Sequence, residues 1–366
     1  MIKRDSCVTC NCNTVSQFLV IPKFPVYSGI REEHEESLFQ DMKWGQCKNC
    51  GCIQILELID LELLYHRTHN PAIGKSWQHH HDSFSSYVIK KMCGKKILEI
   101  GGANLKVSKL ILEKSKSDIE YTVVDFSCGE YENDARVKMI KSSFSSTKEL
   151  FDTIIHSHTF EHSYDPIKFL KEISISLADE GVMIMSIPNL ENQVRSLHMN
   201  ALNFEHTFFY DDRILHHIVS SAGLEIVDIF KYSEWNNFYV CKKKKDSLII
   251  AAKLSEYPRQ LFEDFIGSIK KDVSILNEKI DQSFCFGAHI FTQMLLCFGL
   301  DEEKIQGVLD NDPNKIGKFL YGSNLKVYGP EIIEHLDQPT VILRVSQFKE
   351  EIQDQIETIN RHTILV

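Results

Sequence analysis

Short apolar runs alternate with amphipathic stretches through the middle of the chain, beginning near residue 95. The pattern predicts a strand over 96–102 that ends in a glycine turn, a helix over 107–114 and a second strand over 121–125. Further strands are predicted over 151–156 and 182–188, with a helix over 166–177 between them. Strands that alternate with helices are typical of βαβ units. This part therefore predicts an open, parallel α/β sheet whose ligand lies at the carboxyl ends of the strands.

A second unit of the same kind follows four consecutive lysines at 242–245, which we interpret as a solvated turn. The predicted elements are a strand over 247–252, a long amphipathic helix over 257–279, a strand and glycine turn over 283–288, a helix through residue 298 and a strand over 305–309. Asp310 lies 23 residues after Gly287, the spacing of an acid that binds a ribose in a nucleotide-binding fold. A packing domain without a ligand explains one glycine equally well.

Length and composition divide the chain and limit its partners. At about 150 residues per domain, 366 residues make two or three domains, and we predict them at 1–75, 76–245 and 246–366. The 41 Lys and Arg against 51 Asp and Glu give a net charge of −10, which disfavours nucleic acid and anionic membranes as partners. The first residues lack the apolar core of a signal peptide, and no apolar run is long enough to span a membrane, so we expect a cytoplasmic protein.

Six of the eleven cysteines lie in the first 52 residues. Four of them form two C-x2-C pairs, Cys7 with Cys10 and Cys47 with Cys50. Paired thiolates at this spacing predict one tetrahedral zinc ion, and four thiolates leave no open coordination position, so the predicted zinc is structural. Disulfides are disfavoured in a reducing compartment, and a redox C-x2-C site needs only one pair. Cys12 or Cys52 can replace a neighbouring ligand within its pair.

Histidines cluster between the second cysteine pair and the predicted sheet. His66, His69, His79, His80 and His81 fall on a predicted loop and helix. No acidic residue is placed to complete a recognisable ligand set with them, and histidines on a polar helical face more often point to solvent or to a substrate. We therefore do not predict a second metal in this stretch, and we keep His80 as a candidate pocket residue with a catalytic role.

The first predicted strand of the sheet ends in a glycine corner, Gly101 and Gly102, which lets the backbone approach a ligand closely. Asp125 ends the second strand, 24 residues after Gly101, where a carboxylate can accept both hydroxyl hydrogens of a ribose. The corner lacks the G-x-G-x-x-G spacing that binds a pyrophosphate, so a nucleoside without phosphate, S-adenosylmethionine, fits better than a dinucleotide. In the alternative interpretation, Asp125 only caps the following turn.

A Glu-His pair, Glu205 and His206, follows the end of the strand at 182–188 and so lies on the cofactor side of the predicted sheet. Methyl transfer requires that donor and acceptor are aligned and that the acceptor loses a proton. Histidine titrates near neutrality, so His206 can take this proton while Glu205 orients the ring. In the alternative interpretation, both residues form a surface pair on a loop.

Together these features resemble the sugar C-methyltransferases of deoxysugar biosynthesis along nearly the whole chain. Besides the cysteine pairs, the matching stretches are 76–80, 97–102, 158–162 with 165–166, 187–189, 286–289 and 308–318. The resemblance implies a zinc-binding N-terminal domain, a central class I methyltransferase domain with a Rossmann-like sheet and a C-terminal Rossmann-like α/β domain. It implies S-adenosylmethionine as methyl donor, and the residues we expect to contact it are Glu99, Gly101, Gly102, Asn104, Asp125 and His158.

The resemblance also implies that Glu205 and His206 face a sugar, with His206 as the base. We expect a nucleotide-linked or otherwise activated sugar, methylated on carbon by a monomer or homodimer. The family's tyrosine two positions before the glutamate is Asn203 here, and its second tyrosine has no clean match over 65–69, so methylation on oxygen or nitrogen stays open. Two other classes are a non-catalytic assembly protein with a degraded cofactor fold and a zinc-knuckle nucleic-acid binder, which the acidic balance disfavours.

Overall fold

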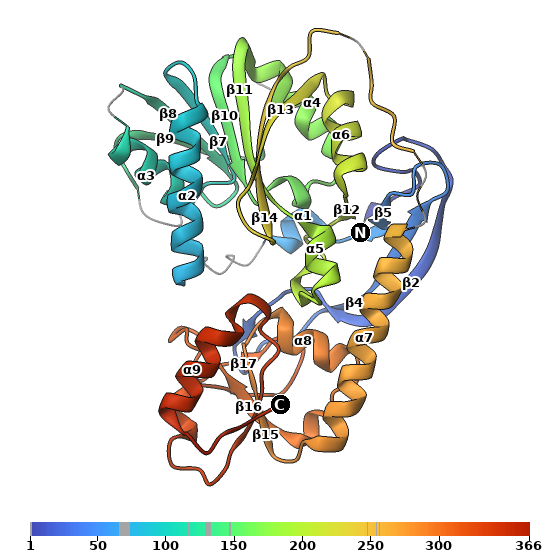
Figure 1. Ribbon diagram of the computed structural model, residues 1–366, viewed down its shortest axis with the longest axis vertical. Coiled ribbons are helices and arrows are strands. Elements are labelled where there is room, and N and C mark those ends of the chain that lie inside the picture. Colours follow the sequence, from blue (N-terminus) through green and yellow to red (C-terminus); the bar gives the residue numbers. More distant parts are fainter. Residues whose placement is uncertain are drawn as a thin grey trace.

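Three folded parts follow one another along the chain, and the N-terminal part runs along the other two (Figure 1). The computed structural model describes residues 2–65, 74–115, 118–128, 133–145, 148–246, 248–253, 255 and 257–366. In Figure 1 the central sheet and its helices lie above the C-terminal part, and the long strands β2 (Val15–Pro25) and β4 (Phe39–Cys47) run beside α7 (Tyr257–Lys279). Ring contacts of Phe18 and Trp44 with Phe262 join these strands to α7.

The central part is built on a seven-stranded sheet in the order β13-β14-β11-β10-β7-β8-β9. Its strands are β7 (Lys96–Ile100), β8 (Glu120–Asp125), β9 (Val137–Lys141), β10 (Phe151–Ser157), β11 (Leu177–Pro188), β13 (Leu224–Lys231) and β14 (Asn236–Lys243). Neighbouring strands are parallel except for β14, which is antiparallel to both β11 and β13. The strand order reverses between β7 and β10, and ligands of such sheets bind at the carboxyl ends of the strands at that point.

Helices cover both faces of this sheet because alternate side chains of each strand point to opposite faces. The helices are α2 (Lys75–Lys91), α3 (Lys106–Lys114), α4 (Pro166–Ser176) and α6 (Asp212–Ser221). Ile97 of β7 shares one apolar core with α2 and α3, whereas the next residue, Leu98, shares another with α4 and α6. The carboxylate of Asp165 accepts a hydrogen bond from the backbone of Lys168 and so fixes the start of α4.

The N-terminal part shares strands with both other parts. Its four-stranded antiparallel sheet has the order β12-β5-β4-β2, in which β5 (Ile53–Ile55) pairs with β12 (Phe208–Phe209) of the central part. The other strands are β1 (Ile2–Lys3), paired with β6 (Glu57–Leu58), and β3 (Ile30–Arg31), paired with β17 (Phe319–Leu320) of the C-terminal part. Backbone hydrogen bonds therefore join the N-terminal part to the residues directly after Glu205 and His206.

The C-terminal part is a smaller parallel α/β unit whose five-stranded sheet has the order β18-β16-β15-β19-β20. After α7 its elements are β15 (Ser283–Phe286), α8 (Ile290–Cys297), β16 (Ile305–Leu309), β18 (Val327–Tyr328), β19 (Thr340–Ile342), α9 (Lys349–Ile359) and β20 (Ile364–Leu365). The parallel sheet confirms the predicted fold class for this part. The helix predicted over 257–279 and the strand predicted over 305–309 are found with those bounds.

Two predicted elements differ from the structure. The strand predicted over 247–252 is wrong, because the described residues 248–253 are irregular and Leu248 is 70% exposed. The hydrogen bonds of this segment go to side chains of α6 instead: the amide of Ile250 donates to Ser220 Oγ at 2.9 Å, and His217 Nδ1 lies 2.7 Å from the carbonyl of Ile250. The strand predicted over 182–188 begins five residues earlier, since α4 ends at Ser176 and β11 starts at Leu177 without a connecting loop.

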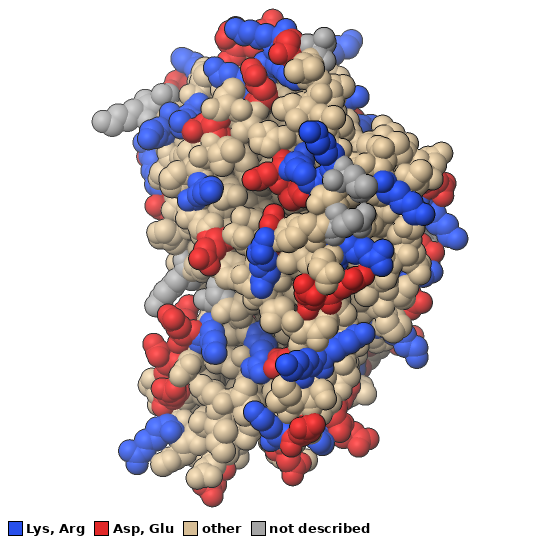
Figure 2. All heavy atoms as spheres, turned by 45° about the vertical axis from the view of Figure 1, so that its right-hand side comes forward, with Lys and Arg blue, Asp and Glu red and all other residues tan. Residues whose placement is uncertain are grey.

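The surface carries both charge signs side by side. On the face shown in Figure 2, Lys and Arg side chains are intermixed with Asp and Glu side chains. Within the described part of the chain, no helix combines the length and the apolar character that crossing a bilayer requires.

Candidate functional site

The four predicted cysteine ligands meet in space. Cys7 Sγ lies 3.6 Å from Cys50 Sγ, Cys10 Sγ lies 3.6 Å from Cys47 Sγ, and all four sulfurs lie within 4.8 Å of one another. Zinc–sulfur bonds of about 2.3 Å in a tetrahedron place sulfurs about 3.8 Å apart, so the cluster fits a metal ion of this kind. Cys12 and Cys52 do not belong to this group of four.

Backbone geometry supports each cysteine pair. The amide of Thr9 donates to Cys7 Sγ and the amide of Asn49 donates to Cys47 Sγ, both at 3.4 Å. Gly51 follows the second pair with φ +76°, a conformation that glycine adopts without strain. Amide hydrogens aimed at sulfur stabilise thiolates, so both turns are shaped for metal ligands.

The glycine corner at the end of β7 is too crowded for larger residues. Gly101 has φ +83°, and a Cβ atom there would lie 2.4 Å from Thr159 Oγ1. A Cβ atom on Gly102 would lie 2.4 Å from the carboxyl carbon of Glu99. The two glycines thus let β7 turn sharply beside the start of the segment after β10, at the carboxyl ends of the strands where the strand order reverses.

Asp125 stands at the carboxyl end of β8, beside the glycine corner. Its Oδ1 accepts a 2.7 Å hydrogen bond from the amide of Ser127, and its Oδ2 lies 3.4 Å from the amide of Ala103. The first bond is the turn cap of the alternative interpretation. The second is long. A carboxylate oxygen can accept more than one hydrogen bond, as a ribose-binding carboxylate must. The next residue, Phe126, stacks on Tyr65 with ring centroids 5.8 Å apart.

Glu99 and Asn104 form hydrogen bonds next to the glycine corner. Glu99 is 4% exposed and accepts a 2.8 Å hydrogen bond from the hydroxyl of Tyr121. Burial is the main cause that raises the pKa of Glu99 to about 7. Asn104 accepts a hydrogen bond from the amide of Lys106 at the start of α3. Both contacts shape the turn, and their contact with the cofactor stays a prediction.

His158 and His80 lie in an aromatic cluster beside the corner. His158 has φ +51°, its Nδ1 lies 3.2 Å from Glu161 Oε1, and its ring meets the ring of Trp77 edge-on at 5.0 Å. His80 is 3% exposed, and its Nε2 shares a 2.9 Å hydrogen bond with the hydroxyl of Ser186. Burial lowers the pKa of His80 to about 2, so this ring is neutral. His80 touches Trp77 and His158, which line the large cavity described below.

The Glu205–His206 loop is organised by Asn203, the residue that stands in the place of the family's tyrosine. Its side-chain oxygen accepts hydrogen bonds from the amides of Glu205 at 2.8 Å and His206 at 2.9 Å. The Nδ1 atom of His206 donates to the carbonyl of Ala201 at 3.1 Å, because a carbonyl can only accept. The neutral ring therefore carries its lone pair on Nε2. Burial lowers the pKa of His206 to about 4.

Several residues of this site were not predicted. Glu161 is fully buried, and it meets His162 and His206 so that one ligand atom of each lies within 4.8 Å of the others. Burial raises the pKa of a carboxyl group, but the hydrogen bond from His158 and the nearby imidazoles outweigh burial and lower the pKa of Glu161 to about 2. Tyr65 lies 3.4 Å from His162 Nδ1. Glu161 and His162 are part of the stretch 158–162, but only the fold brings His206 to them.

Arg4 holds the loop from the N-terminal side. Its half-buried guanidinium donates to the carbonyl and hydroxyl of Thr207, to the carbonyl of Tyr164 at 2.8 Å and to the carbonyl of Ile55. Arg4 and Thr207 are 203 residues apart, so no spacing rule could have joined them. The candidate histidine His206 is thus fixed by a side chain that lies three positions before Cys7.

A cavity of about 660 Å³ lies between the central and C-terminal parts. Its walls include Trp77, His158 and His206 from the central part and His289, Asn311 and Phe348 from the C-terminal part. The cavity brings together candidate residues that the sequence places more than 100 positions apart. Its volume is that of a small-molecule site.

Asp310 also lines this cavity, but both oxygens of its carboxylate already accept hydrogen bonds from the protein. Oδ2 accepts hydrogen bonds from the amide of Ala288 at 2.8 Å and from Lys315 Nζ at 2.9 Å, and Oδ1 accepts one from the amide of Asp312. These bonds close the turn after β15. The geometry therefore favours the packing interpretation of Asp310 over the ribose interpretation.

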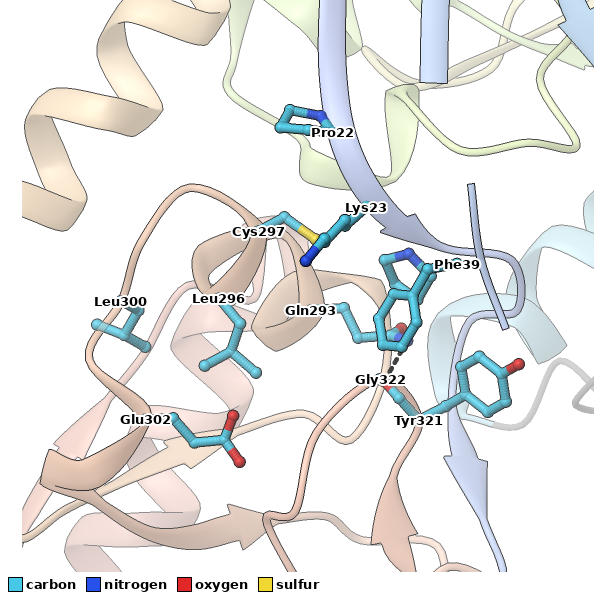
Figure 3. Close-up of a pocket in the computed structure, with 11 residues that line it drawn as sticks. Pro22, Lys23, Phe39, Gln293, Leu296, Cys297, Leu300, Glu302, Tyr321 and Gly322 are labelled. Carbon is cyan, nitrogen blue, oxygen red and sulfur yellow. Dashed lines mark hydrogen bonds between the residues drawn. The ribbon is translucent and has the colours of Figure 1, made fainter. Parts of the chain in front are cut away.

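A second cavity, of about 480 Å³, lies at the junction of β2 and α8 (Figure 3). Lys23 and Phe39 approach it from the N-terminal part, and Gln293 from α8. The amide of Gln293 donates to the carbonyls of Tyr27 and Tyr321, and its oxygen accepts from Gly29. The junction therefore joins the N-terminal and C-terminal parts by a buried amide.

Two family models match the chain. A methyltransferase domain matches residues 77–229, and a C-methyltransferase C-terminal domain matches residues 260–364. A comparison with curated proteins returned no match. The first match covers the glycine corner, Asp125 and the Glu205–His206 loop. The second covers the parallel unit after 260.

Solved structures that match a little under half of the chain include several methyltransferases, at low identity. The CcbJ methyltransferase from Streptomyces caelestis is 11% identical with a TM-score of 0.36, over 45% of this chain and 89% of its own. An S-adenosylmethionine-dependent methyltransferase from Clostridium acetobutylicum is 14% identical with a TM-score of 0.35, over 46% of this chain and 98% of its own. An O-methyltransferase family protein from Burkholderia thailandensis is 11% identical with a TM-score of 0.36, over 47% of this chain and 57% of its own.

The family models favour an enzyme of the methyltransferase class, and they confirm the predicted fold class. The seven-stranded sheet and the parallel C-terminal sheet are the two matched units, and the cysteine cluster precedes them. The chain is an S-adenosylmethionine-dependent methyltransferase that joins an N-terminal four-cysteine cluster to a methyltransferase domain and a C-methyltransferase C-terminal domain.

Proposed function

We propose that this methyltransferase acts on a nucleotide-linked or otherwise activated sugar and transfers the methyl group to carbon. The single observation that carries the proposal is the cavity between the central and C-terminal parts, which has His206 in its wall and a volume that suits a small polar acceptor. The C-methyltransferase C-terminal domain forms the opposite wall. Both domains then enclose the acceptor.

The donor is held at the glycine corner. The backbone at Gly101 and Gly102 and the carboxylate of Asp125 face the adenosine, and His158 lies on the side towards the cavity. S-adenosylmethionine supplies a methyl group on a positively charged sulfur, which a nucleophile displaces in line. The residues of the corner contribute by orientation, since correct alignment of the reacting atoms is a large part of such a rate enhancement.

The Glu205–His206 pair takes the proton that the acceptor loses. For a carbon next to a carbonyl, removal of this proton leaves the electron pair that attacks the methyl group. His206 presents Nε2 as a proton acceptor because Nδ1 donates to Ala201. Asn203 keeps the pair in place through the two amide hydrogen bonds.

Methylation on oxygen or nitrogen is the second candidate. The observation that favours it is Asn203, whose side chain hydrogen-bonds to the loop backbone and to Asn200. In the family that the sequence resembles, a tyrosine at this position would help to polarise the carbonyl of a keto sugar. The Asn203 side chain is not available for this role. The same proton acceptor serves a hydroxyl or amine acceptor.

The four cysteines bind zinc in this proposal and give it a structural role. Four thiolates saturate a tetrahedral ion, so the metal has no open position for a substrate. Its place beside Arg4 and the β5–β12 pairing supports a role in holding the Glu205–His206 loop. Reduced thiols of this kind suit a cytoplasmic enzyme.

The test uses S-adenosylmethionine labelled with ¹³C in the methyl group and a panel of nucleotide-linked keto, hydroxyl and amino sugars. The expected product is a keto sugar with a new carbon–methyl bond, located by NMR. A label on oxygen or nitrogen would support the second candidate. Label transfer to none of the sugars, by protein that binds the donor in calorimetry, would contradict a sugar acceptor.

A further inference from the structure

Glu161, His162 and His206 form a compact cluster whose members come from two loops. Glu161 and His162 belong to the 3-10 turn η1 (Phe160–His162) after β10, and His206 belongs to the loop before β12. One ligand atom of each lies within 4.8 Å of the others. Backbone bonding brings the loops together, since the amide of Thr207 donates to the carbonyl of Glu161 at 3.3 Å.

The carboxylate of Glu161 lacks a partner on one side. The residue is fully buried, Oε1 lies 3.2 Å from His158 Nδ1, and Oε2 has no hydrogen-bond partner among the described residues. A buried carboxylate oxygen without a partner destabilises the fold relative to one that accepts a hydrogen bond or binds a cation. The imidazoles of His162 and His206 lie near this carboxylate, so a cation held by the three side chains would give it a further partner.

The imidazole rings of His162 and His206 have polar partners of the kind that orient metal-binding histidines. His206 donates its Nδ1 hydrogen to the Ala201 carbonyl, which leaves Nε2 for a ligand bond. His162 has Tyr65 at 3.4 Å from Nδ1 and Glu205 at 3.8 Å from Nε2. Metal-bound histidines regularly have one nitrogen on a carbonyl, carboxylate or similar group that fixes the ring orientation.

We propose that Glu161, His162 and His206 form a divalent cation site, separate from the four-cysteine cluster, at the wall of the acceptor cavity. One carboxylate and two imidazoles suit manganese, iron(II), cobalt or zinc, whereas the four thiolates select zinc. Three protein ligands leave coordination positions open. His206 lines the cavity, so an oxygen atom of a bound acceptor can reach them.

The site deepens the proposed function and rests on it for its role in the reaction. The cation holds the acceptor's carbonyl or hydroxyl oxygen and stabilises the negative charge that develops there, a task for which the family's tyrosine is missing at Asn203. With a cation bound, Nε2 of His206 is a ligand and no longer accepts a proton. Within the Glu205–His206 pair, the proton of the acceptor then passes to the Glu205 carboxylate, and His206 holds the cation instead of acting as the base. The new bond to the methyl carbon forms as the carbon–sulfur bond breaks, and sulfur keeps that electron pair.

The test is titration of the full-length, zinc-loaded protein with Mn²⁺, followed by calorimetry and by the electron paramagnetic resonance signal of free Mn²⁺. We expect one Mn²⁺ per chain in the wild type. Glu161→Gln and His162→Ala should each weaken it by at least about 10- to 100-fold, since changes to groups that only orient a ligand already cost this much. His335→Ala removes a histidine that is 90% exposed and should bind Mn²⁺ like the wild type.

Circular dichroism and thermal unfolding identify variants that do not fold, and zinc content shows that the cysteine cluster is intact. If Glu161→Gln is misfolded, His162→Ala alone decides, because His162 is partly exposed. Unchanged Mn²⁺ affinity in a folded variant, or no Mn²⁺ binding by the wild type with or without S-adenosylhomocysteine, would overturn the site. The Mn²⁺ titration contains no acceptor sugar, so its result does not depend on the sugar assay. The cation site can be contradicted while sugar methylation is observed, and Mn²⁺ can bind while no sugar is methylated.

Discussion

Hydrogen bonds to the backbone determine which atom of a candidate side chain can react. Asn203 holds the amides of Glu205 and His206, and the carbonyl of Ala201 takes the Nδ1 hydrogen of His206. The sequence predicted the Glu-His pair. It could not predict these bonds, because they depend on the path of the loop backbone and not on residue type.

Asp125→Ala should weaken the binding of S-adenosylhomocysteine by about 10- to 100-fold, because a charged hydrogen bond to a ribose is worth roughly 1.5–3 kcal/mol. Calorimetry measures the affinity, and thermal unfolding reports the separate effect of losing the cap on Ser127. Asp118→Ala, at a residue whose side chain is 96% exposed, is the control. Equal affinities of the Asp125 variant and the wild type would contradict the proposed contact between the Asp125 carboxylate and the ribose.

Glu99→Gln should gain stability over wild type as the pH rises. The folded pKa of Glu99 is about 7 against 4.5 for an ordinary glutamate, because the side chain is buried. As the pH rises, the unfolded chain therefore releases this proton before the folded chain does. The free energy of unfolding of the wild type falls by up to about 3 kcal/mol between pH 4.5 and 7. Glutamine has no proton to lose and still accepts from Tyr121.

Urea unfolding of both proteins without cofactor measures this effect at pH 5 and pH 8. The stability of Glu99→Gln relative to wild type should be higher at pH 8 than at pH 5. A relative stability that is the same at both pH values would show that Glu99 ionises normally in the folded protein.

Among the elements, the loop before β12 depends on contacts from the N-terminal part. Arg4 donates to Thr207, and β5 pairs with β12 directly after it. The hydrogen bonds of Asn203 and His206 stay within the loop, so these partners from the N-terminal part determine where the loop lies relative to the rest of the protein.

Arg4→Ala should lower the turnover number by roughly 100-fold, because a shift of about 1 Å in a catalytic group is enough for such a loss. Affinity for S-adenosylhomocysteine should stay near wild type, since Asp125 lies on β8 and not on this loop. Lys3→Ala, at the exposed neighbour, serves as control. If Arg4→Ala lowers the affinity for S-adenosylhomocysteine and the turnover number by the same factor, the variant is generally unfolded, and displacement of the loop alone would be contradicted.

Elements with a strong local pattern were predicted well, and those that depend on partners were not. The period of apolar residues predicted α7 and β16 with their bounds, and the glycine corner marked the carboxyl end of β7. The segment 248–253 is also apolar in part, but its backbone bonds to His217 and Ser220 of α6 and not to a strand, and only the tertiary fold determines this. The meeting of Glu161 with His206 likewise depends on the tertiary fold.

At the scale of the whole molecule, the N-terminal part joins the two α/β units. Strand pairing connects it to β12 and to β17, and the buried amide of Gln293 holds its chain against α8. The acceptor cavity lies between the same two units, so their relative position determines its shape. The sequence predicted three parts in this order, but not the strands that they share.

Replacing Cys47 and Cys50 together with serine should release one zinc ion per chain and lower the melting temperature. Binding of structural zinc contributes on the order of 10 kcal/mol in small domains, so the N-terminal part loses its main constraint. Turnover should fall as well, because β5 no longer fixes β12. Metal analysis by mass spectrometry and calorimetric melting measure both effects.

Cys12→Ser is the matched control, since Cys12 lies in the same segment but outside the group of four sulfurs. It should keep both zinc and the wild-type melting temperature. A double variant of Cys47 and Cys50 that retains its zinc would contradict the ligand assignment, and one that loses zinc without any change in melting would contradict the structural role.

A crystal structure with S-adenosylhomocysteine bound shows where the donor's sulfur points, and so whether the glycine corner and the cavity form one active site. We expect the adenosine at Gly101 and Gly102 with its ribose on Asp125, and the sulfur directed into the cavity towards His206. Adenosine bound at the Gly287 turn of the C-terminal part, or a sulfur that faces bulk solvent, would contradict it.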